Sequence, residues 1–216
     1  MIDIEGLSKG FGKRMLWRDV SLTVSRGEML ALIGPSGSGK STLLNCLGLL
    51  DRPNSGAIRH EGNDITRFGR REARLFRRDV LGYLFQGYAL IENATVEENL
   101  EVAVKPRRAP RDKAGPSLAE ALERVGLAGR HKETVHRLSG GEQQRVALAR
   151  LIVQQPALVL ADEPTAALDH DNTGMVLDSL REMSQAGCAV VIATHNDTVR
   201  DACDNVFAVG APLAAR

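Results

Sequence analysis

The run Gly34-Pro35-Ser36-Gly37-Ser38-Gly39-Lys40-Ser41-Thr42 decides the fold of this chain. It fits the pattern G-x-x-x-x-G-K-[ST], in which backbone N–H groups surround a polyphosphate. The apolar run 29–33 before it is typical of a buried parallel strand, and residues 41–47 after it predict a helix. Because the helix points its positive end at the loop, we predict a phosphate site in which Lys40 reaches the terminal phosphates and the Ser41 hydroxyl binds Mg²⁺.

The alternative is a glycine- and serine-rich turn that precedes Lys-Ser by coincidence. Average composition gives such a match in about one of a hundred chains of this length. A strand before the loop and a helix after it make a coincidence rarer still. The sequence therefore predicts nucleotide binding from this stretch alone.

Composition narrows the class of protein. With 216 residues, 43% of them hydrophobic, the chain is expected to form one globular domain. A net charge of +1 and an aromatic content of 4% give no case for nucleic acid as a partner. No apolar run approaches the roughly 20 residues of a membrane helix, and residues 1–5 do not resemble a signal peptide. The three widely spaced cysteines predict reduced structural thiols in a cytosolic protein.

Short apolar/polar alternation predicts a small antiparallel β layer beside the phosphate loop. Its expected strands are residues 2–7, 20–24 and 56–60, separated by turn signals that include Lys9-Gly10-Phe11-Gly12. Phe11 is therefore expected on a turn. There it has two interpretations, stacking on a purine ring or packing in the core of the layer, and the residues alone do not separate them.

The remaining pattern alternates strands and helices, as in an α/β fold. We expect helices at 67–78, within 92–115, at 117–125, from 140 to about 155 and at 172–186, and strands at 80–85, 157–161, 188–193 and 206–209. The helix at 67–78 is basic, which favours a solvated face over a phosphate or headgroup contact. The basic, proline-bearing segment 105–113 is expected to be a surface loop.

Polar side chains follow three of the predicted parallel strands. Gln86 ends the first, Asp162 and Glu163 end the second, and His195 follows the third. Because ligands bind at the carboxyl ends of parallel strands, we expect these side chains at one edge. Asp162 would help to hold Mg²⁺, Glu163 would activate the attacking water, and His195 would contact the terminal phosphate. The alternatives are a helix N-cap for the acidic pair, a core or turn histidine, and a satisfied turn glutamine.

The stretch Leu138-Ser139-Gly140-Gly141-Glu142-Gln143-Gln144-Arg145 predicts a second helix start able to bind an anion. Ser139 and Glu142 form a capping box. Capping does not explain the two adjacent glycines, which weaken a helix unless another group must approach the backbone closely.

Together these residues resemble the ATP-binding subunit of an ATP-binding cassette (ABC) system, over nearly the whole chain. The resemblance lies in six motifs in order: the Walker A loop 34–42, the Q-loop glutamine Gln86, the signature 138–145, Walker B with its glutamate at 158–163, the D-loop Ala167-Leu168-Asp169 and the switch histidine His195. Two positions depart from the family pattern. Phe11 stands where the adenine-stacking residue is usually Tyr, and Ala167 stands where Ser is common.

The resemblance implies a P-loop fold of ABC type: a mostly parallel RecA-like sheet with helices on both faces, a small antiparallel β layer and a helical subdomain. Residues 1–216 would form a single nucleotide-binding domain, with the core at 1–86 and 156–216 and the helical subdomain at about 87–155. It implies a head-to-tail homodimer in the ATP-bound state, in which each phosphate loop faces the partner's signature.

The resemblance also implies the roles of individual residues, with ATP and Mg²⁺ as ligands. The residues implied are Phe11, Gly34, Pro35, Ser36, Gly37, Ser38, Gly39, Lys40, Ser41 and Thr42 for ATP; Ser139, Gly140, Gly141 and Glu142 for the partner's ATP; Glu163, His195 and Gln86 for hydrolysis; Ser41, Gln86 and Asp162 for Mg²⁺; and Asp169 for coupling in the dimer.

Residues 48–56 and Leu84-Phe85-Gln86 resemble the branch that contains the lipoprotein-release, macrolide-export and cell-division ATPases. The run 88–100 most closely resembles a bacteriocin-export subgroup. The resemblance implies a motor that hydrolyses ATP to drive a separate membrane permease, as an exporter, at the cytoplasmic face of the plasma membrane.

Two other functions remain open at this point. One is an ATPase of the same branch that signals through a membrane protein to a hydrolase outside. The other is a soluble ABC ATPase of DNA maintenance or translation. Such chains typically carry a long coiled-coil insertion or two cassettes in tandem, and this sequence shows neither feature. A small GTPase is disfavoured because Thr194-His195-Asn196-Asp197 is not an Asn-Lys-x-Asp motif. The sequence does not indicate the transported molecule.

Overall fold

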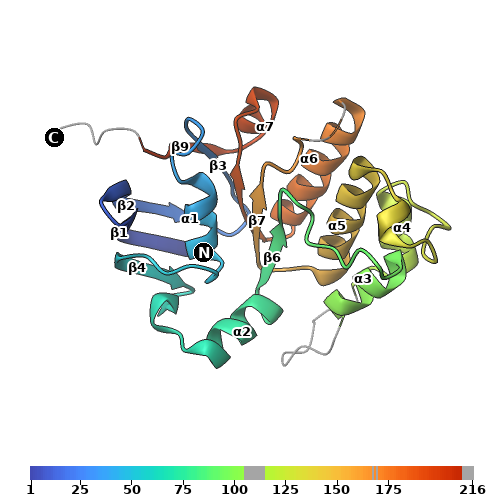
Figure 1. The fold of residues 1–216 in the computed structure, drawn as a ribbon, viewed down its shortest axis with the longest axis horizontal. Helices are drawn as coiled ribbons and strands as arrows, with labels where there is room; N and C mark the ends of the chain where they lie inside the picture. The colour runs from blue at the N-terminus through green and yellow to red at the C-terminus, as the bar shows by residue number, and fades with distance from the viewer. Residues whose placement is uncertain (105–114, 167, 169, 211–216) are drawn as a thin grey trace.

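The fold contains two β-sheets, a five-stranded parallel sheet and a four-stranded antiparallel sheet (Figure 1). The computed structural model describes residues 1–104, 115–166, 168 and 170–210. The parallel sheet has the strand order β6 (Leu81–Leu84), β7 (Leu158–Asp162), β8 (Ala189–Ala193), β3 (Met29–Ile33) and β9 (Asn205–Ala208). The antiparallel sheet has the order β2 (Arg14–Val24), β1 (Ile2–Phe11), β4 (Ser55–His60) and β5 (Asn63–Asp64).

Helices cover both faces of the parallel sheet (Figure 1). They are α1 (Lys40–Leu47), α2 (Arg70–Asp79), α3 (Val96–Val104), α4 (Leu118–Arg124), α5 (Gly140–Gln154), α6 (His170–Gln185) and α7 (Asp197–Asp201), with 3-10 turns at Ile65–Arg67 and Val135–Arg137. Among the described residues, no helix is both long enough and apolar enough to cross a membrane.

The buried side chains form two clusters, one on each face of the parallel sheet. Along β7, Val159 and Ala161 pack with α3, α5 and α6, while Leu158 and Leu160 pack with α1 and the antiparallel sheet. Both faces of the strand are therefore covered, which explains why the central strands are continuous apolar runs. The predicted α/β fold, a parallel sheet with a small antiparallel layer, is confirmed.

Several boundaries differ from the prediction. β1 continues to Phe11 and β2 begins at Arg14, so Phe11 ends a strand and is not part of the turn. The pairing of these strands is irregular at three points between Ile4 and Gly10. Such bulges interrupt the two-residue alternation by which a strand is recognised in a sequence.

The helix expected within 92–115 begins at Val96, where Thr95 caps it: Thr95 Oγ1 accepts from the Glu98 N–H at 3.2 Å. The short elements β5 and α7 were not predicted. The segment 105–113, predicted to be a surface loop, lies outside the described residues. The helix expected at 67–78 is α2, which buries Phe76.

The three cysteines are free thiols. Cys46 and Cys188 are buried, and burial raises the pKa of each thiol to about 12. Cys203 is half-buried, and burial raises its pKa to about 11. All three thiols are therefore protonated near neutral pH, and Cys46 and Cys188 are also shielded from reagents by burial.

A first prediction concerns Gly82, which brings β6 against the end of α5. A Cβ at this position would lie 2.6 Å from Leu151 Cδ2 and 2.7 Å from Pro156 Cγ. Gly82→Ala should therefore lower the free energy of unfolding by about 1–3 kcal/mol, measured by chemical denaturation. The matched control is Gly174→Ala in α6, where a Cβ meets nothing within 4 Å. It should stabilise the chain by about 0.5–1 kcal/mol. Equal effects of the two substitutions would contradict this packing.

Candidate active site

The loop between β3 and α1 is shaped by glycines. Gly34 and Gly39 have φ angles of 146° and 95°, which side chains other than glycine rarely adopt. A Cβ at Gly34 would lie 2.6 Å from Val209 O, and one at Gly39 would lie 2.8 Å from Trp17 Nε1. The backbone of the loop therefore lies too close to Val209 and Trp17 for a side chain at either glycine. At the start of α1, backbone N–H groups and the positive end of the helix dipole point to the centre of the loop.

Lys40 already engages the loop. Its ammonium donates to Gly34 O at 2.8 Å and to Pro35 O at 3.4 Å. On the other side, Arg14 Nη2 donates to Gly37 O at 3.2 Å and Trp17 Nε1 donates to Gly39 O at 3.3 Å. The loop is therefore held in a curled form by hydrogen bonds of the protein itself.

Ser41 and Asp162 meet across the cleft. The Ser41 hydroxyl donates to Asp162 Oδ1 at 3.0 Å. Burial raises the pKa of the Asp162 carboxyl, and the hydrogen bond from Ser41 opposes that rise. Mg²⁺ binds oxygen ligands, commonly one or two carboxylates together with substrate phosphates. The donor set of Ser41 and Asp162 fits this pattern, and among the described residues no cluster of three His, Cys, Asp or Glu side chains forms a complete metal cage.

Glu163 and His195 form a second pair at the same edge of the sheet. His195 Nδ1 lies 2.8 Å from Glu163 Oε1, and the two side chains are 73% and 15% exposed. Glu163 has a φ of 48°, and its N–H donates to Ala193 O at 2.9 Å. A left-handed glutamate is strained, and such strain persists where the surroundings hold it. The carboxylate is thus fixed beside an exposed imidazole.

The structure excludes the N-cap alternative for the acidic pair and the core alternatives for His195 and Phe11. The helix that follows Glu163 in the chain begins at His170, so neither acidic residue is adjacent to a helix start. With its side chain 73% exposed, His195 is not a core histidine. Phe11 is also 55% exposed, with Lys9 Nζ 4.7 Å from the ring centroid, so the core alternative is wrong for this ring.

One open cleft of about 860 Å³ brings most of the predicted residues together. Its lining residues are Phe11, Arg14, Leu16, Ser36, Gly37, Gly39, Lys40, Ser41, Thr42, Gln86, Asp162, Glu163 and His195. Gly34, Pro35 and Ser38 belong to the same loop but do not line the cleft. Arg14 and Leu16 were missed by the sequence analysis. They reach the cleft through the β1–β2 hairpin, which no local pattern places there.

The signature residues lie elsewhere. Ser139, Gly140, Gly141 and Glu142 begin α5 and are absent from the cleft lining. Ser139 N donates to Glu142 Oε2 at 2.7 Å, so the predicted capping box is present. Hydrogen bonds from Ser139 and from Arg130 lower the pKa of Glu142 to about 2. Ala167 and Asp169 of the predicted D-loop lie outside the described residues.

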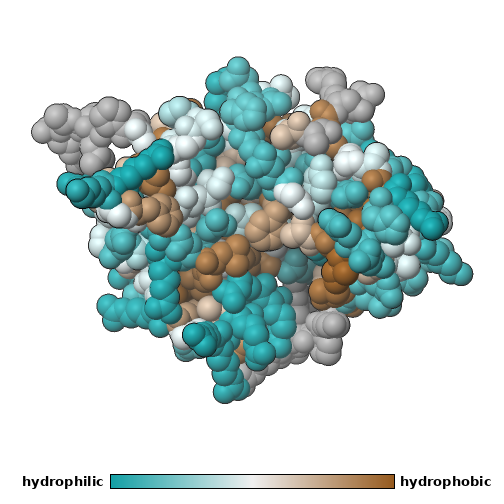
Figure 2. Space-filling view, in the orientation of Figure 1, coloured by the Kyte–Doolittle hydropathy of each residue, from teal (hydrophilic) through white to brown (hydrophobic). Residues whose placement is uncertain are grey.

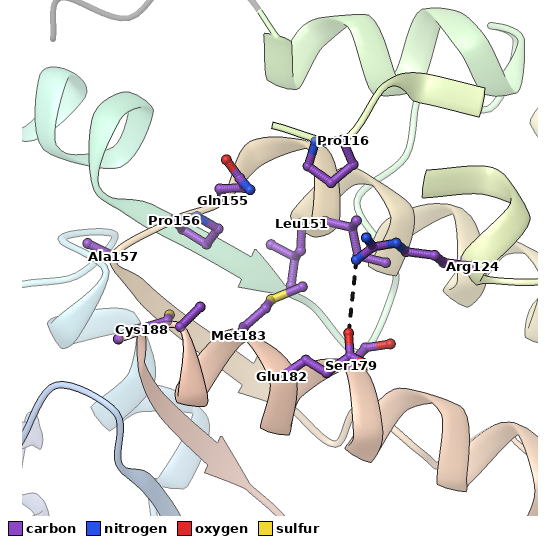
Figure 3. A pocket seen from close by; sticks show the side chains of 13 residues that line it. Pro116, Arg124, Leu151, Gln155, Pro156, Ala157, Ser179, Glu182, Met183 and Cys188 are labelled. Carbon is purple, nitrogen blue, oxygen red and sulfur yellow. Dashed lines mark ion pairs between the residues drawn. The ribbon is translucent and has the colours of Figure 1, made fainter. Parts of the chain in front are cut away.

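A different pocket, of about 450 Å³, lies between α4, α5 and α6 (Figure 3). Leu151, Met183 and Cys188 line it, and Arg124 and Glu182 form an ion pair of 3.9 Å at its side. It contains no residue of the phosphate loop or the strand ends. It is therefore separate from the candidate active site.

Comparisons with known proteins agree with this geometry. The ABC transporter family model matches residues 17–166. A macrolide export ATP-binding/permease protein of Paracoccus denitrificans is 42% identical over 88% of this chain and 28% of its own length. An arginine transport ATP-binding protein of Bacillus subtilis is 40% identical over 90% of this chain and 81% of its own length. The chain spans about a third of the length of the curated ATP-binding/permease relatives it matches.

A solved structure is also similar. It is the dimer of an ATP-binding cassette in a post-hydrolysis state, bound to ADP and Pi. It superposes with a TM-score of 0.86 at 32% identity, over 97% of this chain and 94% of the other. The fold and the branch predicted from the sequence are supported by these relatives.

A second prediction follows from the buried carboxylate of Asp162. The pKa of Asp162 is higher in the folded chain than in the unfolded chain. At a pH above the pKa of the unfolded chain, ionisation of this carboxyl therefore lowers the free energy of unfolding. At acid pH the carboxyl is protonated in both states, so this destabilisation is absent. Asp162→Asn should therefore raise the melting temperature of the ligand-free protein at pH 7.5, with a smaller gain at pH 4.5. Asp178→Asn, at an exposed position of α6, is the control and should leave both values unchanged. A gain that grows toward acid pH would contradict the assignment.

Proposed function

Because the chain belongs to the ABC transporter family, we propose that it is the ATP-hydrolysing motor of a membrane export system. The observation that carries the proposal is the convergence of two pairs on one cleft. Ser41 with Asp162 supplies oxygen ligands for Mg²⁺, and Glu163 with His195 supplies a base beside an exposed imidazole. Lys40 and the N-terminus of α1 supply positive charge to the phosphates between them.

Each residue has one task in the proposed reaction. Glu163 orients the attacking water and accepts its proton, and His195 donates to the terminal phosphate. Ser41, Asp162 and the amide oxygen of Gln86 would hold Mg²⁺, which would supply positive charge to the phosphates. Phosphoryl transfer to water needs positioning and charge neutralisation, so no covalent intermediate is required. Phe11, half-exposed at the mouth of the cleft, stacks on the adenine.

The signature residues complete a second site across a head-to-tail dimer. Ser139 to Glu142 do not line the cleft of their own chain, which supports a role toward the ATP of a second copy. Hydrogen bonds to a charged group contribute roughly 1.5–3 kcal/mol each. Three or four of them to a terminal phosphate match the ~5.5 kcal/mol that reverses a 1:99 equilibrium. Hydrolysis removes these contacts and opens the dimer. Asp169 would take part in coupling between the two copies.

A third prediction tests the base. Glu163→Gln keeps the shape of the side chain but removes its proton affinity. ATP binding should persist, turnover should fall by about 10²-fold or more, and a dimer should accumulate with ATP. Turnover is measured by phosphate release and the dimer by size-exclusion chromatography. Glu182→Gln, an exposed glutamate of α6, is the control and should retain turnover. Hydrolysis near the normal rate in Glu163→Gln would refute the assignment.

The membrane partner is proposed to dock on a groove beside Gln86. This groove of about 380 Å³ lies between α2, β6 and α3 and is lined by Leu50, Arg77, Arg78, Leu81, Tyr83, Phe85, Ala89, Val102, Ala103, Arg150 and Gln154. Figure 2 shows apolar side chains on this side of the molecule, in one patch above α2 and another beside α3. The rings of Tyr83 and Phe85, which line the groove, are stacked with 3.8 Å between their centroids. An apolar groove next to a phosphate-sensing loop suits a short helix of a permease.

Residues about 87–155 would then act as the helical subdomain that moves with the partner. Attachment to a permease would hold the chain at the cytoplasmic face of the plasma membrane. The macrolide-export relative favours export over import, although the arginine transport relative leaves import as the second candidate. Within the export branch, the run 88–100 supports the bacteriocin-export subgroup. No nucleic acid is proposed as a partner.

A fourth prediction tests the groove. Val102→Glu should reduce capture of a polytopic membrane protein from detergent-solubilised membranes by about tenfold or more, because a carboxylate would be buried against the partner. Val104→Glu is the matched control. Both valines are exposed on α3, at 48% and 49%, and only Val102 lines the groove. ATP turnover of either isolated variant should stay normal. Equal loss of capture in both variants, or in neither, would refute this docking site.

A further inference from the structure

The turn that follows Gln86 has an unusual backbone. Tyr88 and Ala89 have φ angles of 60° and 49°, so two successive residues with side chains are left-handed. Tyr88 N donates to Phe85 O at 2.9 Å and Ala89 N donates to Gly87 O at 2.6 Å, which makes the turn tight. Few side chains adopt this conformation unless the surroundings impose it.

Arg150 of α5 holds this turn in place. Its Nη1 donates to Ala89 O at 2.8 Å and its Nη2 donates to Tyr88 O at 3.2 Å. Both carbonyl groups of the left-handed pair are therefore bound by one guanidinium. Because Arg150 lies in the helix that begins at the signature, the turn is attached to the signature helix.

The side chain of Tyr88 reaches the other end of the same helix. A Cβ added at Gly140 would lie 3.1 Å from the Tyr88 hydroxyl oxygen and 4.0 Å from its Cζ. A Cβ at Gly141 would lie 3.4 Å from Leu168 Cδ2. The two signature glycines thus admit side chains from two loops of their own chain, a close approach that the sequence analysis required without identifying it.

The rest of the segment after the turn is bound to the residues that precede the signature. Val96 N donates to Glu133 O at 2.9 Å and Val135 N donates to Ala94 O at 3.0 Å. The side chain of Asn99, which is 1% exposed, bonds both backbone groups of Ile91. Residues 91–99 and 131–138 therefore form one hydrogen-bonded unit, and Gln143 of α5 joins it by donating from Nε2 to Leu138 O at 3.0 Å. The turn 87–89 is the connection between Gln86 and this unit.

We propose that Tyr88 is a positioning residue that fixes Gln86 and the signature end of α5 relative to each other. The proposal rests on the proposed function, in which Gln86 contacts the ATP of its own chain and Ser139 contacts the ATP of the partner. The Tyr88 hydroxyl lies against Gly140, and Arg150 binds the carbonyl groups of the turn. Both interactions hold the turn after Gln86 against α5, the helix that begins at the signature.

The test is a suppressor pair in ATP turnover. Gly140→Ala places its methyl group 3.1 Å from the Tyr88 hydroxyl, so kcat should fall by about tenfold or more. Adding Tyr88→Phe removes that oxygen and leaves Cζ at 4.0 Å, so the double variant should regain at least half of the lost kcat. Tyr83→Phe is the control. It removes a hydroxyl that bonds Asn45, away from Gly140, and should restore nothing.

Two results would overturn the proposal: normal kcat in Gly140→Ala, or no recovery in the double variant. Hydrogen–deuterium exchange of the ligand-free protein tests the Tyr88 contact without ATP turnover, so it distinguishes a wrong positioning role from a wrong proposed function. Tyr88→Ala should increase exchange in peptides covering 138–145 and leave α6 unchanged. Increased exchange in a protein without ATP turnover would mean that the contact is real and the proposed function is wrong. Unchanged exchange would exclude the contact itself.

Discussion

Parallel pairing of β6, β7, β8 and β3 is the constraint on which the site depends. In this register Leu84 pairs with Ala161 and Asp162 with Ala193, so strands far apart in the sequence end together. The residues one or two positions after each strand end therefore lie at the same edge, which is why Gln86, Glu163 and His195 share one cleft with the loop after β3. The contacts inside the cleft adjust a geometry that the sheet has already set.

In the dimer proposed above, the same chain would carry two half-sites, and the second does not line the cleft of its own chain. The phosphate loop and the strand ends make one, and the start of α5 makes the other. The first is preformed: Lys40 and Arg14 hold the loop through its carbonyl groups. The second is also ordered, since Glu142 is bound by both Ser139 and Arg130. Order in both halves of a ligand-free chain lowers the conformational cost of bringing two copies together.

The parallel strands and the helix starts could be predicted from the sequence because each depends on residues that are close together in the chain. Buried parallel strands are continuous apolar runs, and in the capping box Glu142 follows Ser139 by only three positions. Contacts across the chain were not predictable in this way. The β1–β2 bulges hide the strand that carries Phe11, and the hairpin that brings Arg14 to the loop has no local signal. The approach of Tyr88 to Gly140 joins residues 52 positions apart, so the glycines indicated that a neighbour exists but not which one.

The buried cysteines have a practical consequence for following motion in this chain. Cys46 and Cys188 are enclosed in the two cores, and their raised pKa values keep both thiols protonated at neutral pH. A maleimide reacts with exposed thiolates, so a cysteine introduced on the surface will be labelled ahead of these two. Only the half-buried Cys203 needs replacement before a fluorophore pair is attached. Distances between α2 and α5 can then be recorded in single molecules with both native core thiols left in place.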